Sequence, residues 1–464
     1  MKGAVNSSAN ALAAIFLAAC AVESAPDSGP VRPTNVVLIV VDTLRMDHTS
    51  LDGYERDTTP FLAELVSDGA ASFSQFRASA PWTKPSVASL FTGLDPLGHG
   101  VLQHPDRLHS SYNTLAEVYQ KAGYQTAGFQ TNLLLSSAFG FDQGFDSYNE
   151  EHLVGHSQST GAELNGAVAK WLDDERDPEL PYFLYIHHFE PHFDYLRSGE
   201  EWVADYDGPL TGSETMEQLI GATDKLRNEE FRFLASRYDA EIKYQDQLLR
   251  ELWGEFGSRS LQDDVVLVIT ADHGEEFGDH GDLAHQYKMY DELLRVPLVI
   301  RSGIDTGLVF APGEEQRPQG LRDLGATLLC LSGVAPNFHG QPFALEGSLK
   351  REVSDNEPSL AHTIYFDDLR QARRRDMLVS GDWKLIRQEG GAGHPERFQL
   401  FHLRDDPSEK HNRAEELPDI VRKLESKLRA KLLRNEEVFQ ADRKPEATQL
   451  SDELLQRLAD LGYL

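Results

Sequence analysis

Acidic side chains follow two strongly apolar segments of the chain, at the points where those segments end. The aliphatic run 36–41 leads into Asp42, and the run 265–271 leads into Asp272 and His273. Such runs are typical of strands buried on both faces of a parallel sheet. A carboxylate at the mouth of a buried strand is unfavourable unless it is paired, hydrogen-bonded or bound to a metal ion. Because ligand crevices lie outside the carboxyl ends of strands, we expect Asp42, Asp272 and His273 to converge at one sheet edge, with both carboxylates as candidate metal ligands.

The elements that must position these residues alternate between strand and helix patterns from 35 to about 340. This alternation indicates an α/β fold, with a large, mostly parallel sheet sandwiched by helices. Residues 58–69 and 112–123 are predicted to form helices that end at glycine. Residues 181–188 are predicted to form another central strand that ends on polar side chains. A longer amphipathic helix is expected over 231–253.

The pattern changes after about 340, where short strands replace the longer elements. A small C-terminal antiparallel sheet is therefore expected, followed by a charged helix over 417–435. Its strands are predicted at 363–367, 377–380, 383–387 and 398–403. Upstream, residues 198–230 are acidic and weakly periodic. We interpret them as an insertion over the active-site face that sets substrate specificity.

The charge of the chain restricts its partners. It has 464 residues, of which 40% are hydrophobic and 26% charged, as expected for a globular protein with a large core. Its 44 basic and 75 acidic residues give a net charge of −31, which argues against binding of nucleic acid. The same negative charge disfavours densely sulfated polyanions as substrates, unless a local basic or metal-rich cleft offsets the repulsion.

The N-terminus has the features of an export signal. Residues 9–19 form an alanine-rich apolar run that is too short to span a membrane. Residues 17–20, Leu-Ala-Ala-Cys, resemble the cleavage box of bacterial lipoproteins. We therefore predict a lipoprotein-type signal peptide over 1–20, a membrane tether through lipidated Cys20, a polar linker over 21–33, and location in the periplasm or cell envelope. An ordinary secretory signal cut nearby is the alternative.

Several motifs stand in the order found in one known family. The opening strand with its Asp42, the segment 83–93 (Thr-Lys-Pro-Ser-Val…Leu-Phe-Thr-Gly) and the segment 272–281 (Asp-His-Gly-Glu…Gly-Asp-His-Gly) resemble the metal and nucleophile motifs of the sulfatases, in the alkaline-phosphatase superfamily. Further similar segments are 139–146, 191–192, 295–298, 381–386 and 406–412. The resemblance implies a sulfatase-like catalytic domain over 34–345 and a C-terminal subdomain with a helical tail over 346–464.

In that family the nucleophile motif is Cys/Ser-x-Pro-x-Arg, and its first residue is oxidised to formylglycine. Here Thr83 holds that position and Val87 replaces the arginine. A threonine hydroxyl can itself attack an ester when a metal lowers its pKa, as in phosphoester-cleaving members of the superfamily. The alternative role of Thr83 is a helix N-cap, and both roles are compatible because helix N-termini stabilise oxyanions. Ser86 is a weaker candidate nucleophile.

The resemblance assigns further site residues. His273 becomes the third metal ligand, while His192 and His285 are expected to protonate the leaving group or to contact the anion. Lys84 is expected either to contact the ester anion or to be solvated. The other histidines near these motifs, His99, His187, His188 and His280, are interpreted as structural or supporting.

One divalent ion is expected on Asp42, Asp272 and His273. The family favours Ca²⁺, whereas threonine chemistry suits Mn²⁺ or Zn²⁺, and Thr43 stands where many sulfatases have another aspartate. The predicted function is a metal-dependent hydrolase that cleaves the sulfate or phosphate ester of a small molecule, glycan or lipid through in-line attack by Thr83. The alternatives are a phosphodiesterase or phosphotransferase acting on lipid or glycan head groups, and a catalytically inactive binding lipoprotein.

Overall fold

The computed structural model describes residues 34–151, 160–193, 195, 206–303, 314–315, 319–335, 338–342, 359–366, 372–391 and 395–442. Within them lies an eight-stranded sheet in the order β11-β2-β10-β7-β1-β6-β4-β5. Its strands are β1 (Asn35–Val41), β2 (Ala71–Phe73), β4 (Gln125–Gln130), β5 (Ser147–Asn149), β6 (Tyr182–His188), β7 (Val265–Ala271), β10 (Leu298–Ser302) and β11 (Glu314–Glu315). Only β10 runs antiparallel to its neighbours in this sheet, so the predicted mostly parallel sheet is confirmed.

The three central strands are buried along their whole length, as the apolar runs predicted. The parallel register pairs Val40 of β1 with His187 of β6 on one side and with Thr270 of β7 on the other. Since the three strands run in the same direction and end level with one another, the residues that follow them meet at one edge of the sheet.

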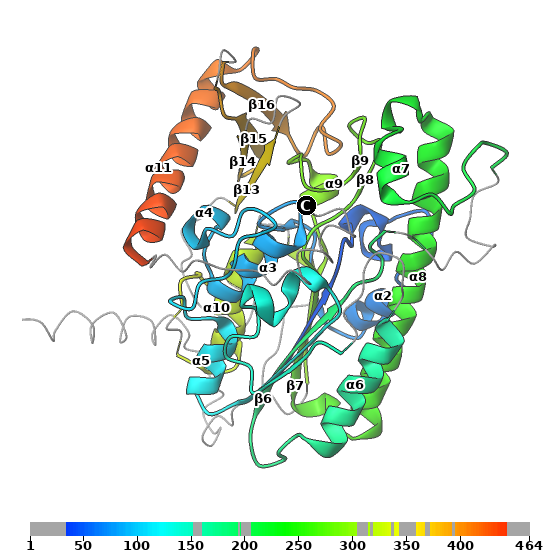
Figure 1. Cartoon of the computed structure of the whole chain (residues 1–464), viewed down its shortest axis with the longest axis vertical. Coiled ribbons are helices and arrows are strands. Elements are labelled where there is room, and N and C mark those ends of the chain that lie inside the picture. Colours follow the sequence, from blue (N-terminus) through cyan, green and yellow to red (C-terminus); the bar gives the residue numbers. More distant parts are fainter. Residues whose placement is uncertain are drawn as a thin grey trace, which may run out of the picture.

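Helices cover both faces of this sheet (Figure 1). One layer contains α2 (Pro60–Ser67), α6 (Gly161–Asp174) and α8 (Asn228–Ser258); the other contains α3 (Thr83–Thr92), α5 (Leu115–Lys121) and α10 (Leu321–Leu331). The helices predicted over 58–69, 112–123 and 231–253 correspond to α2, α5 and α8. Helix α8 begins earlier than predicted, because the Glu230 carboxylate accepts a hydrogen bond from the Arg227 amide at 2.8 Å and completes its first turn.

Short elements connect these layers. They are α4 (Pro96–His99), α7 (Met216–Ile220), α9 (Asp291–Leu294), the pair β3 (Phe76–Arg77) with β12 (Gln319–Gly320), and the pair β8 (Glu276–Phe277) with β9 (Leu283–Ala284). The predicted insertion is described from residue 206 onward, where α7 packs against β9 next to His285. Its role in substrate specificity stays a prediction.

A second, four-stranded antiparallel sheet is built from β13 (Ser359–Phe366), β14 (Ala372–Ser380), β15 (Trp383–Gln388) and β16 (Arg397–His402). One face, with Leu378 and Leu385, packs on α11 (Pro418–Asp442). The other face, with Met377 and Ile386, joins the core of the main domain. The C-terminal antiparallel sheet and the charged helix are thus confirmed, whereas the exact domain boundary near 345 lies outside the described residues.

Cys330 is buried in α10. The predicted signal peptide and polar linker, residues 1–33, lie outside the described residues. Among the helices of the described part of the chain, none combines the length and apolar character needed to cross a membrane.

Candidate active site and metal centre

The two predicted carboxylates meet at the carboxyl ends of β1 and β7, and both are fully buried. Asp42 Oδ2 accepts a hydrogen bond from Asn132 Nδ2 at 2.9 Å. Asp272 Oδ1 accepts hydrogen bonds from the backbone amides of His273 at 2.9 Å and Thr43 at 3.3 Å. Thr43 adopts a left-handed φ of 56°, an uncommon conformation for threonine that occurs here at the metal-facing edge of the sheet.

One oxygen of each carboxylate remains unsatisfied. Asp42 Oδ1 and Asp272 Oδ2 are buried and have no hydrogen-bond partner among the described residues. Burial raises the pKa of Asp42 to about 7, and burial together with the nearby Asp42 raises the pKa of Asp272 to about 8. Two buried carboxylates with orphaned oxygens are the arrangement that a bound cation would stabilise.

The imidazole of His273 faces both orphaned oxygens. Its Nε2 lies 3.5 Å from Asp42 Oδ1 and 3.6 Å from Asp272 Oδ2, while Nδ1 lies 2.9 Å from Gly274 O. Because Nδ1 donates to that carbonyl, Nε2 carries the lone pair that a metal ligand needs. The sequence-predicted residues Asp42, Asp272 and His273 are therefore brought together with their ligand atoms facing one another.

The predicted nucleophile, Thr83, lies next to His273. Thr83 Oγ1 is 3.3 Å from His273 Nε2. Helix α3 begins at Thr83 itself, and the N-cap position is held by Trp82, so the N-cap role considered for Thr83 is wrong. Its hydroxyl thus stands at the helix N-terminus, where backbone N–H groups and the helix dipole favour negative charge.

These atoms fit a four-coordinate ion. Ligands about 2.0–2.2 Å from a tetrahedral zinc ion lie about 3.3–3.6 Å from one another. The separations of 3.3, 3.5 and 3.6 Å from His273 Nε2 to the other three candidate ligand atoms are compatible with that spacing. The donor set of two carboxylates, one imidazole and one hydroxyl is suited to Zn²⁺ or Mn²⁺, and it offers fewer oxygens than Ca²⁺ usually takes.

Sequence reasoning treated His187 only as a structural or supporting residue, yet it lies at this centre. Asp42, His187 and Asp272 place ligand atoms within 4.8 Å of one another, which makes them an alternative ligand set. However, His187 Nε2 approaches Asp42 Oδ2 at 3.3 Å, the oxygen that Asn132 already occupies. The orphaned oxygens face His273 instead, so we assign His187 to supporting Asp42. The signal that could have found it is its place at the end of a central buried strand.

Two further predicted residues flank the centre. His285 Nδ1 lies 2.9 Å from Glu275 Oε1, and its ring centroid is 4.5 Å from that of His273. Burial lowers the pKa of His285, but Glu275 and the two metal-site aspartates outweigh burial and raise this pKa above its ordinary value. The ring of His192 is 5.1 Å from that of His285 and stacks on Phe189 at 4.5 Å. Both imidazoles thus lie beside the centre, His285 against His273 and His192 against His285.

The loop that carries His192 is fixed to the N-terminus of α6 by hydrogen bonds to Glu190. Glu190 is buried, and its Oε1 accepts hydrogen bonds from the backbone amides of Thr160 at 3.0 Å and Gly161 at 3.1 Å. These amides open α6, so a carboxylate satisfies the N-terminus of that helix. The acidic residue before Pro191 thus fixes the loop to the scaffold.

Lys84 is not solvated, and its expected contact with the ester anion stays a prediction. It is fully buried, its Nζ donates to His104 O at 2.6 Å and lies 3.3 Å from the ring centroid of Phe139. Burial holds the pKa of Lys84 well below its ordinary value. The expectation of a solvated lysine is wrong because α3 is enclosed on all sides, and none of the contacts described for Lys84 points to Thr83. Ser86 is also engaged, donating to Asp272 O at 2.6 Å.

Residues 34–334 match the sequence model of the Sulfatase family. The chain belongs to the sulfatase family. It is 26% identical over 316 residues to a protein named low-salt glycan biosynthesis sulfotransferase Agl7 from Haloferax volcanii, covering 65% of this chain and 63% of that protein. It is 24% identical over 451 residues to mouse arylsulfatase K, covering 85% of this chain and 79% of the relative.

Solved structures show the same fold. A protein in complex with its substrate D-glucosamine-2-N,6-O-disulfate superposes with a TM-score of 0.72 at 18% identity, covering 89% of this chain and 100% of that protein. The phosphonate monoester hydrolase of Agrobacterium radiobacter superposes with a TM-score of 0.67 at 19% identity, covering 87% of this chain and 96% of that enzyme. The chain is thus a sulfuric ester hydrolase by family, with a fold shared by phosphonate ester hydrolases.

Proposed function

We propose that this sulfatase-family enzyme hydrolyses sulfate esters on glycans and uses Thr83 directly as its nucleophile. The observation that carries the proposal is the position of Thr83 Oγ1, 3.3 Å from His273 Nε2, which itself faces Asp42 and Asp272. The similarity in fold to a protein whose substrate is a sulfated glucosamine supports the choice of a glycan ester.

Asp42, Asp272 and His273 would hold one divalent ion, with Thr83 as the fourth ligand. When bound, that ion would lower the pKa of the Thr83 hydroxyl and neutralise charge on the transferred group. Its identity is part of the proposal, and the four-coordinate spacing favours Zn²⁺ or Mn²⁺ over the Ca²⁺ expected from the family.

The remaining steps of the proposed reaction are carried out by side chains of the protein itself. Thr83 Oγ, after its proton is released to solvent, attacks sulfur in line, and the S–Oγ bond forms as the bond from sulfur to the ester oxygen breaks. His285 or His192 gives its proton to the departing oxygen, so the alcohol leaves neutral. The same imidazole, now neutral, takes a proton from a water molecule that attacks the sulfur, and the S–Oγ bond breaks to release sulfate and restore the Thr83 oxygen. The N-terminus of α3 stabilises the negative charge on the transferred group throughout.

A second candidate function is hydrolysis of phosphate diesters or phosphonate monoesters. Two observations favour it: the nucleophile position holds threonine rather than a residue that can become formylglycine, and a phosphonate monoester hydrolase shares the fold. A threonine alkoxide attacks phosphorus by the same in-line geometry, so the site itself does not distinguish the two esters.

The test is hydrolysis of matched p-nitrophenyl sulfate, phosphate, phosphodiester and phosphonate monoester substrates, for wild type and Thr83→Ala, with Zn²⁺, Mn²⁺ and Ca²⁺ in turn. Sulfate turnover that disappears in Thr83→Ala supports the lead proposal. Turnover of only the phosphorus esters supports the second candidate. Absence of turnover with every metal and substrate would contradict both and favour an inactive binding protein.

We also propose that the enzyme is exported and held at a membrane by lipidated Cys20. Detergent phase partition and the intact mass of protein from a bacterial host test this proposal. A lipid mass that is lost in Cys20→Ala supports the tether, whereas a water-soluble protein with an unmodified Cys20 contradicts it.

A further inference from the structure

The strands β8 and β9 form a short hairpin that begins and ends at two residues of the candidate active site. Glu275 precedes β8 and His285 follows β9, and Glu275 Oε1 lies 2.9 Å from His285 Nδ1. The ring of His285 lies against that of His273, with the centroids 4.5 Å apart. We call residues 275–285 the β8–β9 hairpin. Because only two residue pairs join its strands, a shift of its tip would also move His285 at its base.

The tip of the hairpin carries His280, whose imidazole contacts both the main domain and the C-terminal subdomain. His280 Nδ1 lies 2.6 Å from Glu292 Oε1 of α9, and the ring stacks on Tyr290 with the centroids 3.5 Å apart. Nε2 of His280 lies 3.1 Å from the backbone carbonyl oxygen of Glu409. The Glu409 side chain is buried and pairs with Lys384 of β15 at 2.9 Å, so this residue is fixed to the C-terminal sheet.

Both ring nitrogens of His280 face acceptors, and this geometry determines the protonation state of the ring. A carboxylate and a backbone carbonyl accept hydrogen bonds, whereas a neutral imidazole has a single N–H to donate. The contacts to Glu292 and Glu409 therefore form together only on the imidazolium. Burial and the nearby charge of Lys410 lower the pKa of His280, but the hydrogen bonds to Glu292 and Glu409 and the charge of Glu292 outweigh them and raise it above its ordinary value.

Other charged groups pack against the backbone of His280. Glu276 Oε1 accepts a hydrogen bond from the His280 amide at 3.0 Å. Lys288 Nζ donates to Glu276 Oε1 and to the His280 carbonyl oxygen at 2.9 Å each, and it lies 3.6 Å from Asp282. Glu276 and Lys288 thus pair with each other beside the backbone. The carboxylate that contacts the ring itself is that of Glu292.

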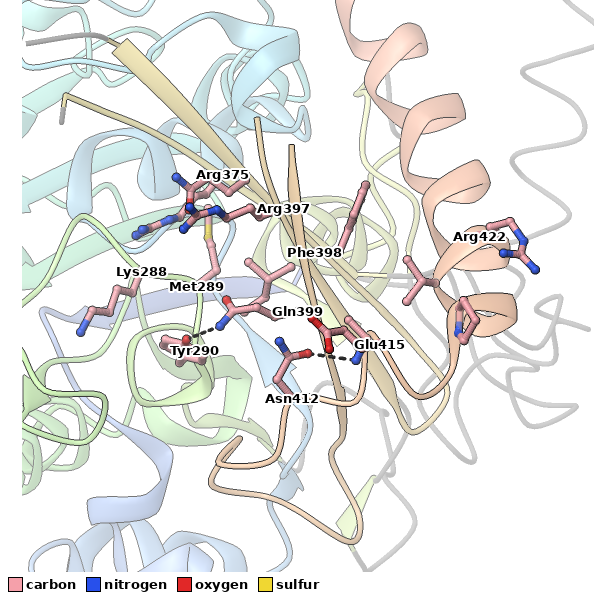
Figure 2. A pocket seen from close by; sticks show the side chains of 15 residues that line it. Lys288, Met289, Tyr290, Arg375, Arg397, Phe398, Gln399, Asn412, Glu415 and Arg422 are labelled. Atoms are coloured by element: carbon pink, nitrogen blue, oxygen red, sulfur yellow. Dashed lines mark hydrogen bonds between the residues drawn. The ribbon is translucent and has the colours of Figure 1, made fainter. Parts of the chain in front are cut away.

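The C-terminal subdomain contacts this region at two further points. Lys410 donates to the backbone carbonyl of Asp279, the residue before His280. Gln399 Nε2 of β16 donates to the hydroxyl of Tyr290 at 2.8 Å, and Figure 2 shows this bond as a dashed line between the C-terminal sheet and the segment before α9. Both members of the stacked pair, His280 and Tyr290, are therefore bonded to the C-terminal subdomain.

We propose that His280 is a positioning residue, which as an imidazolium connects the tip of the β8–β9 hairpin to the C-terminal subdomain and so keeps His285 in place against His273. The part of His285 in the reaction rests on the proposed function, whereas the connection through His280 does not. When His280 loses its proton, one of its two N–H donors disappears, and the contact with either Glu292 or Glu409 is lost. Turnover is therefore expected to fall as the pH rises through the pKa of His280.

The test compares kcat for wild type, His280→Gln and Glu292→Gln between pH 6 and pH 9, with saturating metal and an ester that the wild type hydrolyses. His280→Gln should lower kcat about tenfold at pH 6, because a misplaced His285 acts less well. This difference should shrink as the pH rises, since wild-type His280 then loses its own charge. Glu292→Gln removes the charge that favours the imidazolium, so its kcat should fall at lower pH than that of the wild type.

The matched control is His411→Gln. The His411 side chain lies in the same C-terminal segment as Glu409, is 82% exposed and pairs with Asp406 at 3.4 Å. Its replacement should leave kcat close to the wild-type value at every pH.

The protonation state is measured separately from catalysis, in ring ¹⁵N spectra of protein labelled at histidine. The signal lost in His280→Gln is assigned to His280, and if that variant does not fold, the signal that moves in Glu292→Gln assigns it. Two protonated ring nitrogens are expected at pH 6, with loss of one proton at lower pH in Glu292→Gln than in wild type.

The outcomes are separable from those of the hydrolysis assay of the proposed function. A wild-type advantage over His280→Gln that fades with rising pH, and earlier in Glu292→Gln, supports the positioning role. A ratio of kcat values that is constant with pH, or a His411→Gln variant with the same loss, overturns it. If no ester is hydrolysed, the proposed function fails, and the spectra decide: an imidazolium at His280 supports the connection, and a neutral ring at pH 6 overturns it.

Discussion

The hydroxyl oxygen of Thr83 and Nε2 of His273 lie 3.3 Å apart, although 190 residues separate them in the chain. Helix α3 supplies the first atom and the carboxyl end of β7 supplies the second. This spacing is that of a long hydrogen bond, and it is also compatible with two ligands of one metal ion. The candidate nucleophile and the candidate metal ligands therefore form one arrangement.

Replacement of Thr83 is expected to abolish turnover without unfolding the protein. Thr83→Ala and Thr83→Val should both reduce kcat about a thousandfold or more, since the attacking oxygen is missing. Thr83→Val keeps the β-branched shape at the start of α3, so its thermal midpoint should stay close to that of the wild type. Thr83→Ser should retain measurable activity. If Thr83→Val kept wild-type kcat, water rather than Thr83 would be the attacking group.

Replacement of His273 and replacement of His187 should affect the metal content of the protein differently. His273→Ala removes a ligand, and the purified protein is expected to lose its metal. His187→Gln removes a group that lies between the Tyr185 hydroxyl and Asp42 Oδ2 and supports that carboxylate, so it should weaken metal affinity by about 10–100-fold while leaving one ion bound at saturation. Metal analysis and titration with Zn²⁺ and Mn²⁺ measure both. The reverse order of effects would make His187 the ligand and His273 the supporting residue.

The metal-free protein should lose stability as the pH rises. The folded-state pKa values of Asp42 and Asp272, about 7 and about 8, exceed the ordinary value of 3.8 because both groups are buried. The folded state therefore binds protons more tightly than the unfolded state, and this stabilisation, complete below pH 4, is lost as the pH rises toward 8. In chelator, the thermal midpoint should fall between pH 5 and pH 8. Asp272→Asn should flatten the trend, and added Zn²⁺ should reverse it at pH 8. A midpoint that rises over this range in chelator would contradict the argument.

Much of this arrangement could be predicted from the sequence, because long apolar runs identify β1, β6 and β7, and the residues after them must share an edge. The sequence could not identify His187 as a neighbour of Asp42, since this depends on the register between β1 and β6. Nor could it place Lys84, because the enclosure of α3 is a property of tertiary packing and not of the local pattern.

The attachment of the C-terminal sheet to the main domain should depend on Lys384. Its Nζ is fully buried and lies 2.7 Å from Asp291 of the main domain and 2.9 Å from Glu409. Lys384→Met would leave both carboxylates buried without this partner. Removal of one member of a buried ion pair costs about 3–5 kcal/mol, so a loss of this size in the free energy of unfolding is expected in chemical denaturation.

The control for this experiment is Arg404→Gln, whose ion pair with Asp382 is exposed and should contribute less than about 1 kcal/mol. The double variant Lys384→Met with Glu409→Gln should recover part of the lost stability, because one of the stranded charges is removed as well. If Lys384→Met behaved like Arg404→Gln, water would have to reach this cluster. Apolar contacts of Met377, Val379, Ile386 and Phe401 would then contribute most of the attachment of the C-terminal sheet to the main domain.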